Sequence, residues 1–266
     1  MNKHTPRPII AIGDAHGEYH SFAAVLIHAG LMDPDLNWTG GKTILVQMGD
    51  ILDRGSDPLH IDKLLDVLQL QAKKAGGDII RLIGNHELEI LRKNYFITSL
   101  PYFQVEPFRK KLIRGIEHGR LTAAYSARGF LFTHAGICDN LFAFLKTEIP
   151  DKGKPSPIAF AKYINKTFKE AVKTSNYHNP IFNVSYIRGG SERFGGIFWE
   201  DISSILHNHD LCPFRQIIGH TSVPSISHSE DGKIIAIDVG MARVFEGEFE
   251  YLKIMGAKKV TICKVK

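Results

Sequence analysis

Short apolar runs recur along the chain, separated by stretches that carry one apolar face. Six of these runs are rich in Ile, Val, Leu or Phe, and most close on a glycine or a polar residue, a pattern typical of buried strands. They cover residues 8–13, 43–49, 78–84, 129–134, 215–219 and 233–240. In two further runs, 248–254 and 259–265, charged and apolar residues alternate, which predicts strands at an edge.

Three stretches between these runs predict helices, at residues 19–31, 59–75 and 87–94. The second carries an apolar stripe with the spacing i, i+3, i+4 and i+7, formed by Ile61, Leu64, Leu65 and Leu68. The Gly76-Gly77 pair that follows predicts the end of this helix. Because strands alternate with helices, the pattern predicts an α/β fold.

Two stretches break the alternation. Residues 95–126 are predicted to be helical but irregular, with breaks at Pro101 and Pro107. Residues 151–192 hold several prolines and the pair Gly189-Gly190, and we expect them to open with an exposed connection at 151–157. Both stretches are interpreted as insertions or lids over a core.

Composition limits the class of protein. The chain has 266 residues, 44% hydrophobic and 23% charged, so it can bury the core of one large domain or two small ones. Its formal charge of +5 is scattered, without the basic face typical of nucleic-acid binding. The three cysteines form no CxxC pair, and no apolar run is long enough for a membrane span. We therefore expect a soluble, cytoplasmic protein that binds neither nucleic acid nor membrane.

Five of the predicted strand ends carry a short polar cluster. The clusters are Asp14 and His16 in GDAHG, Asp50, Asp53 and Arg54 in GDILDRG, Asn85, His86 and Glu87 in GNHE, His134 in THAG, and His220 in GHT. Asp14, Asp50 and Asn85 follow one another at about the length of a βαβ unit. Successive parallel strands would therefore deliver these side chains to the same edge of one sheet.

Each cluster alone is explained as a polar turn that closes a buried strand. Five together point to a ligand, because burying so many polar groups is unfavourable unless something binds them. Two divalent cations would do so, and imidazole with carboxylate and amide oxygens suits manganese, iron, zinc or nickel better than calcium. Asp50 is the natural bridging group, since a carboxylate has two oxygens and paired catalytic metals lie roughly 3.5–4 Å apart.

The motifs together resemble those of the calcineurin-like metallophosphoesterase superfamily, and GDILDRG with GNHE resembles its phosphoprotein phosphatase (PPP) branch. The stretch IDVGMAR, at 237–243, is similar to the C-terminal motif of the bacterial-type Shewanella-like protein phosphatases. The resemblance implies a single catalytic domain over residues 1–266. Its fold would be a central β-sandwich flanked by helices, a four-layer α/β/β/α arrangement, with residues 95–126 and 151–192 at the rim of the site.

A set of metal ligands is also implied by the resemblance. One ion would be held by Asp14, His16 and Asp50. The second would be held by Asp50, Asn85, His134 and His220. Manganese is the preferred ion, with iron or zinc as alternatives, and a hydroxide bridging the two ions would attack phosphorus directly.

Three further residues receive catalytic roles from the resemblance. His86 would be the general acid that protonates the leaving group, and Asp53 would hydrogen-bond its imidazole. Arg54 would bind phosphate oxygens through its planar guanidinium group. Glu87, in the same motif as His86, is interpreted as structural and as opening the following helix.

A second phosphate-binding arginine is harder to assign. The family usually places one near the phosphate, but in GGIFWED acids follow Trp199 where some bacterial relatives carry arginine. Arg188 and Arg193, just upstream, are the two candidates, and each is also explained as a surface charge.

The function predicted is that of a dinuclear phosphomonoesterase, a protein phosphatase for phosphoserine, phosphothreonine or phosphotyrosine. Its partner would be a phosphorylated protein or a small phosphoester, and its oligomeric state stays open. One alternative is a hydrolase of nucleotide anhydrides like the diadenosine tetraphosphatases, with Phe182 or Tyr186 stacking on a base. The other is a metal-binding module without catalysis, which the complete set of candidate residues disfavours.

Overall fold

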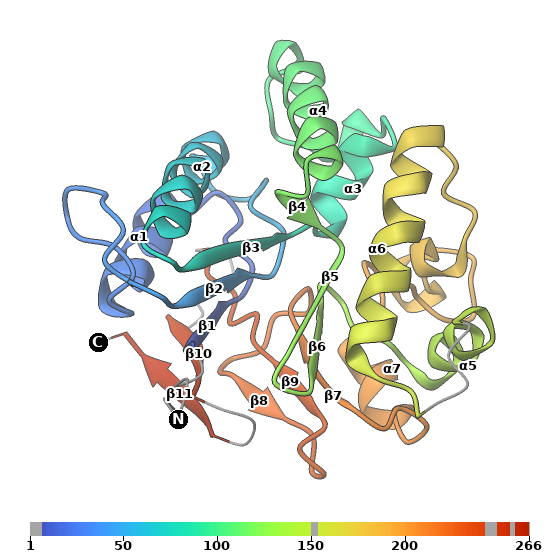
Figure 1. Cartoon of the computed structure of the whole chain (residues 1–266). Coiled ribbons are helices and arrows are strands. Elements are labelled where there is room, and N and C mark those ends of the chain that lie inside the picture. Colours follow the sequence, from blue (N-terminus) through green and yellow to red (C-terminus); the bar gives the residue numbers. More distant parts are fainter. Residues whose placement is uncertain (1–6, 150–153, 243–248, 256–258, 266) are drawn as a thin grey trace.

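The structure, a computed structural model, describes residues 7–149, 154–242, 249–255 and 259–265, and it is built on two mixed sheets (Figure 1). The first sheet has the strand order β11-β10-β1-β2-β3-β4. Its strands are β1 (Ile9–Ile12), β2 (Ile44–Gln47), β3 (Asp78–Leu82), β4 (Leu121–Thr122), β10 (Glu250–Ile254) and β11 (Val260–Lys264). Strands β1 to β4 are parallel, β10 pairs with β1 in antiparallel fashion, and β11 pairs in the same way with β10.

The second sheet has the order β5-β6-β7-β9-β8. Its strands are β5 (Ala124–Ala127), β6 (Phe130–Thr133), β7 (Arg215–Ile218), β8 (Ser227–His228) and β9 (Ile234–Ala236). The three inner strands are parallel, and β5 and β8 are antiparallel edges. The short edge strand β8 was not predicted from the sequence.

The two sheets pack face to face. Ile9 and Ala11 of β1 join Phe130 and Phe132 of β6 in the core between the sheets. The alternate residues of β1 belong to a second core, which the helices cover. The inner strands are therefore buried on both faces, which explains why they are continuous apolar runs. Each such side chain stabilises the fold by about 1.5–3 kcal/mol.

Helices cover the outer faces of both sheets (Figure 1). Against the first sheet lie α1 (Tyr19–His28) and α2 (Pro58–Lys74). Beside the second lie α5 (Asp139–Glu148), α6 (Pro157–Thr174) and α7 (Ile202–His207). The predicted stripe of α2 is buried, and Gly76 ends this helix with a φ of 80°. The predicted four-layer α/β/β/α arrangement is confirmed.

Residues 95–126 are only partly helical. They form η1 (Tyr95–Ile97) and α4 (Tyr102–Glu117), and then supply β4 and most of β5. Pro101 does precede the helix, but the break predicted at Pro107 is wrong, because this proline lies inside α4. It removes one internal hydrogen bond, and the buried apolar face of the helix keeps the element intact.

Residues 154–192 form α6 followed by two short 3₁₀ helices, η2 (Pro180–Phe182) and η3 (Tyr186–Arg188). The beginning of the predicted exposed connection at 151–157 lies outside the described residues, as does residue 248 at the start of a predicted strand. Within the described part of the chain, no helix combines the length and the apolarity needed to cross a bilayer.

Candidate metal centre

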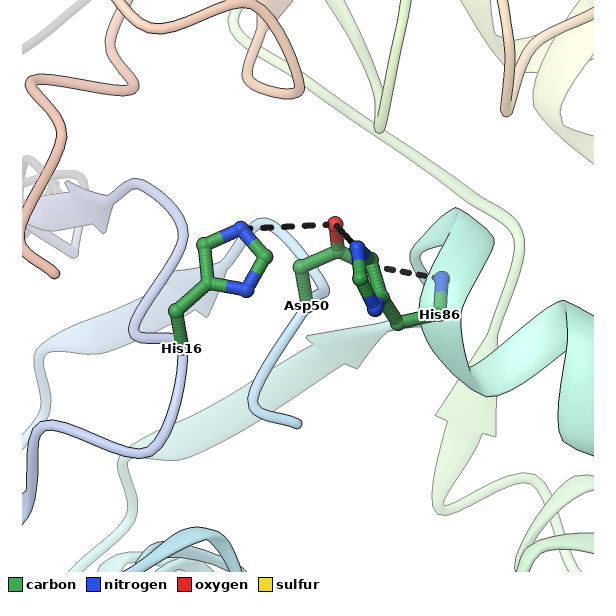
Figure 2. A group of neighbouring side chains, drawn as sticks. All are labelled: His16, Asp50 and His86. Carbon is green, nitrogen blue, oxygen red and sulfur yellow. Dashed lines mark hydrogen bonds and ion pairs between the residues drawn. The ribbon is translucent and has the colours of Figure 1, made fainter. Parts of the chain in front are cut away.

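Asp50 lies at the middle of a cluster of histidines at the strand ends. Its Oδ2 atom is 3.7 Å from His16 Nε2, 3.9 Å from His86 Nε2 and 3.5 Å from His134 Nε2. Figure 2 shows His16 approaching this carboxylate from the loop after β1, and His86 approaching it from α3 (Asn85–Leu91). Asp50 and His134 follow β2 and β6, so both sheets contribute to the cluster.

The remaining predicted ligands join the same cluster. The Oδ1 atom of Asn85 is 2.9 Å from His134 Nε2 and 2.8 Å from His220 Nδ1. Asp14 accepts a hydrogen bond of 3.1 Å from the backbone N–H of His220. All six candidate ligands are therefore close together, although His134 and His220 follow strands of the second sheet and not of the first.

Hydrogen bonds to backbone carbonyls fix which ring nitrogen carries the proton in two of the histidines. His16 Nδ1 donates to the Leu52 carbonyl at 2.8 Å, and His134 Nδ1 donates to the Met48 carbonyl at 2.9 Å. In the neutral imidazoles that a metal requires, the Nε2 lone pairs face the oxygens of Asp50 and Asn85, a contact of acceptor with acceptor that a cation would stabilise. Metal-binding histidines are oriented in this way.

Two buried polar atoms also fit a bound metal. Asp14 Oδ1 and His220 Nε2 have no hydrogen-bond partner among the described residues. Such orphaned atoms are unfavourable inside a protein unless a ligand completes them. The nitrogen and oxygen donors, without a nearby thiolate, suit a divalent first-row transition metal.

The carboxylates in the centre repel one another. Burial, with the charges of Asp238 and Asp50, raises the pKa of Asp14 well above its usual range. Burial would also raise the pKa of Asp50, but the charges of His134 and His86 hold it well below its usual value. The centre therefore combines buried negative charge with histidines, and cations stabilise such an arrangement.

Strained backbone marks the site. Nine non-glycine residues in the described part of the chain have a positive φ, and five of them are site candidates. These are His16 (41°), Asp50 (48°), Asp53 (63°), Arg54 (67°) and His220 (67°). Residues in this region are held there by their surroundings, and they concentrate at functional sites. At Gly84 and Gly219 a side chain would collide with the carboxylates of Asp50 and Asp14, so only glycine fits.

Glu87 braces the loop that carries Asp50. Its buried carboxylate accepts the backbone N–H groups of Gly84 and Asp50, both at 2.9 Å. It also accepts those of Ile51 at 3.0 Å and Leu52 at 3.3 Å. Burial raises the pKa of Glu87 to about 7. The predicted structural role is consistent with these contacts, although the sequence did not show that Glu87 ties β2 and β3 together.

His86 and Asp53 form a hydrogen-bonded pair. His86 Nδ1 donates to Asp53 Oδ2 at 2.6 Å, so His86 Nε2 is the nitrogen turned towards the metal candidates. Burial opposes the charged imidazole, but the charge of Asp50 and the bond to Asp53 raise the pKa of His86 to about 9. The structure brings the predicted acid and its predicted partner together.

The candidate arginines differ in their contacts. Arg54 is exposed and follows Asp53. Its positive charge acts on the site, because burial together with the charge of Arg54 lowers the pKa of His16 to about 4. Arg188 pairs with Asp201 at 2.9 Å and donates to the hydroxyl of Thr221, next to His220. Arg193 is exposed. Only Arg188 of the two upstream arginines is therefore fixed beside the ligands.

The two acids after Trp199 have structural partners. Glu200 is buried and accepts the backbone N–H of Gly195 at 2.9 Å and that of Asp201 at 3.0 Å. Asp201 caps α7 through Ser203 and holds Arg188. The segment after Trp199, which lacks the arginine usual in the family, thus holds Arg188 in place through Asp201.

Comparison with known proteins identifies the family. A family model described as calcineurin-like phosphoesterase matches residues 7–235. The chain belongs to the calcineurin-like phosphoesterase family. It is accordingly a metal-dependent phosphoric ester hydrolase, and the resemblance in its motifs is confirmed.

Individual relatives support this assignment. The phosphoesterase is 45% identical over 103 residues to Shewanella-like protein phosphatase 2 of Arabidopsis thaliana, covering 38% of this chain and 26% of that protein. It is 29% identical over 264 residues to Shewanella-like protein phosphatase 1 of Plasmodium berghei, covering 88% and 67% of the two chains. Its fold matches the cold-active protein-tyrosine phosphatase of a psychrophilic Shewanella species with a TM-score of 0.68 and 19% identity, over 98% and 80% of the chains. The chain thus spans only about a quarter of the Arabidopsis relative.

Proposed function

We propose that this phosphoesterase is a dinuclear phosphomonoesterase that removes phosphate from protein side chains. The observation that carries the proposal is the shared position of Asp50. Two groups of potential ligand atoms, one with His16 and His86 and the other with His134 and His220, both include its carboxylate, and within each group the atoms lie within 4.8 Å of one another. A carboxylate between two such groups is suited to bridging two ions.

The proposed ligand sets follow the strand ends. Asp14, His16 and Asp50 would hold one ion, and Asp50, Asn85, His134 and His220 the other. Manganese is the proposed ion, with iron or zinc as alternatives. When bound, the ions would lower the pKa of a water nucleophile and neutralise charge on the phosphate. We assign His86 to the leaving group and not to a metal, because, against the effect of burial, the charge of Asp50 and the bond to Asp53 raise its pKa to about 9 and favour the protonated imidazole.

The chain's own residues would complete the reaction as follows. His86 Nε2 would donate a proton to the leaving oxygen while its Nδ1–H stays bonded to Asp53. Arg54 and Arg188 would bind the phosphate oxygens. Arg188 is preferred to Arg193 because Asp201 and Thr221 place it beside His220.

Protein substrates are favoured over nucleotides by the position of Phe182. This ring, proposed from the sequence to stack on a base, is buried and stacks on Phe198 with ring centroids 5.8 Å apart. Because Phe182 is buried, it cannot stack on a base, so one of the two aromatic residues proposed for nucleotide binding is excluded. The relatives named as protein phosphatases support the same choice.

Parallel assays test the proposal. The wild-type chain, loaded with Mn²⁺, should hydrolyse phosphotyrosine or phosphoserine peptides, lose activity in EDTA, and bind two metal ions per chain by elemental analysis. Direct attack by water predicts that no phosphorylated enzyme is trapped during turnover of a substrate labelled in its phosphate group. Faster turnover of diadenosine tetraphosphate than of every phosphopeptide would instead support the nucleotide reading. Tight metal binding without any turnover would support the module without catalysis.

A further inference from the structure

We infer that Thr98 and Ser99 are positioning residues, which hold the Asp53 carboxylate so that His86 is correctly aimed at the leaving group. The inference deepens the proposed function and rests on it, because it concerns the acid of that reaction. Neither residue belongs to a motif, and both come from the stretch between η1 and α4 that the sequence indicated only as an insertion.

The two oxygens of Asp53 have separate partners. Oδ2 accepts the imidazole bond from His86 described above, at 2.6 Å. Oδ1 accepts three hydrogen bonds, from Thr98 Oγ1 at 2.8 Å, Ser99 N at 2.6 Å and Ser99 Oγ at 2.9 Å. Three donors on one oxygen fix the plane of the carboxylate, and the other oxygen is thereby directed at His86.

Asp53 needs such support. The residue is only 4% exposed, and its backbone has a φ of 63°, in the left-handed region. A non-glycine residue stays in this conformation only when its surroundings hold it there. The backbone loop does not fix the rotation of the carboxylate about its own bond, and the contacts from Thr98 and Ser99 do.

The hydroxyl of Thr98 is itself held in place. The Leu100 N–H donates to Thr98 Oγ1 at 3.2 Å, and the Leu100 side chain is buried. Thr98 therefore accepts one bond and donates another, which fixes the direction of its hydroxyl. Thr98 and Ser99 thus connect the rim of the site to the Asp53–His86 pair, and neither is a candidate metal ligand.

The chemistry of the leaving group supplies a selective test. As water oxygen bonds to phosphorus, the ester P–O bond breaks and the leaving oxygen keeps the electron pair. A phenolate or alkoxide needs a proton at this step, which His86 would supply and later regain from solvent, whereas dinitrophenolate leaves without one. Misplacing the acid therefore slows substrates with basic leaving groups and spares dinitrophenyl phosphate.

The variants are Thr98→Val, Ser99→Ala and the double variant, with Tyr95→Phe as the matched control. Tyr95→Phe removes a side-chain hydrogen bond from the same stretch without touching Asp53. We expect the double variant to lose about tenfold in kcat on phenyl phosphate and less than about twofold on dinitrophenyl phosphate. His86→Ala should show the same selectivity more strongly, and Tyr95→Phe should show none.

A second measurement does not depend on turnover. In the metal-free protein, the downfield Nδ1 proton of His86, assigned by its loss in His86→Ala, should shift in Thr98→Val and Ser99→Ala but not in Tyr95→Phe. Equal losses on both substrates, or an unshifted proton, would overturn the inference while leaving the proposed phosphatase intact. Absence of turnover by the wild-type chain on every phosphoester contradicts the proposed function itself, and the inference falls with it.

Discussion

The metal ligands and the phosphate-binding arginines are held in different ways. The ligands lie immediately after strands, and all but His220 are almost fully buried. Carbonyl and carboxylate contacts fix their side chains before any substrate arrives. The arginines come from loops and a single turn of 3₁₀ helix, and Arg54 and Arg193 are exposed. This difference indicates a rigid centre for the metals and an adjustable rim for the phosphate.

The largest effect is expected at the bridging position. Asp50→Asn should reduce kcat/KM on an aryl phosphate by about a thousandfold or more, because it removes charge from both proposed metal positions at once. Metal content measured on the same preparation should fall at both positions. The matched control is Asp57→Asn, a carboxylate on the same loop that binds Ser56 and His60 at the surface.

A milder result would change the comparison between centre and rim. If Asp50→Asn keeps more than about a tenth of the wild-type activity with both metals bound, the carboxylate is not shared in the way proposed. If Asp57→Asn loses as much activity as Asp50→Asn, the effect belongs to the loop and not to the bridge.

The two upstream arginines offer a smaller and sharper contrast. Arg188→Ala should lower kcat/KM about tenfold, the loss expected for one hydrogen bond to a charged group, whereas Arg193→Ala should change it less than about twofold. Arg188→Lys should recover only part of the loss, because lysine cannot reproduce the fork that contacts both Asp201 and Thr221. Equal effects of the two alanine variants on steady-state kinetics would show that the rim does not distinguish them.

Sequence patterns revealed the centre because its geometry follows from strand ends. Asp14, Asp50 and Asn85 close parallel neighbouring strands, so their convergence needs no knowledge of side-chain contacts. His134 and His220 belong to the other sheet, and their convergence with the first three depends on how the two sheets pack. The resemblance of the motifs supplied that step, which the apolar pattern alone could not.

Features of the rim could not be predicted, because they depend on contacts between loops. Nothing in the sequence indicates that Asp201 fixes Arg188, or that Ser99 binds Asp53 across 46 positions of sequence. Phe182 is one of two base-stacking candidates under the nucleotide alternative, but its burial against Phe198 places it in the core. Pro107 was assigned to a break because proline disfavours helix interiors, and the apolar face of α4 outweighs that preference.

The smallest predicted effect concerns the stability of the fold. Most substitutions lower the free energy of unfolding, but this one is expected to raise it. In EDTA, Asp14→Asn should be more stable than wild type at neutral pH by about 1 kcal/mol, since it removes a buried carboxylate that Asp238 and Asp50 repel. Because folding raises the pKa of Asp14, its neutral form is favoured in the folded state. The wild-type chain is therefore penalised progressively as pH rises above the unfolded value of about 3.9.

Urea unfolding of both proteins in EDTA, at about pH 5 and about pH 8, measures this penalty, and the advantage of the variant should be larger at the higher pH. With saturating Mn²⁺ the order should reverse, because metal binding stabilises the folded wild type by an amount that the variant cannot match. The same carboxylate then destabilises the metal-free fold and stabilises the loaded one. A variant that is less stable than wild type in EDTA would show that Asp14 is held by contacts within the protein, and that the rigid centre does not depend on metal for its charge balance.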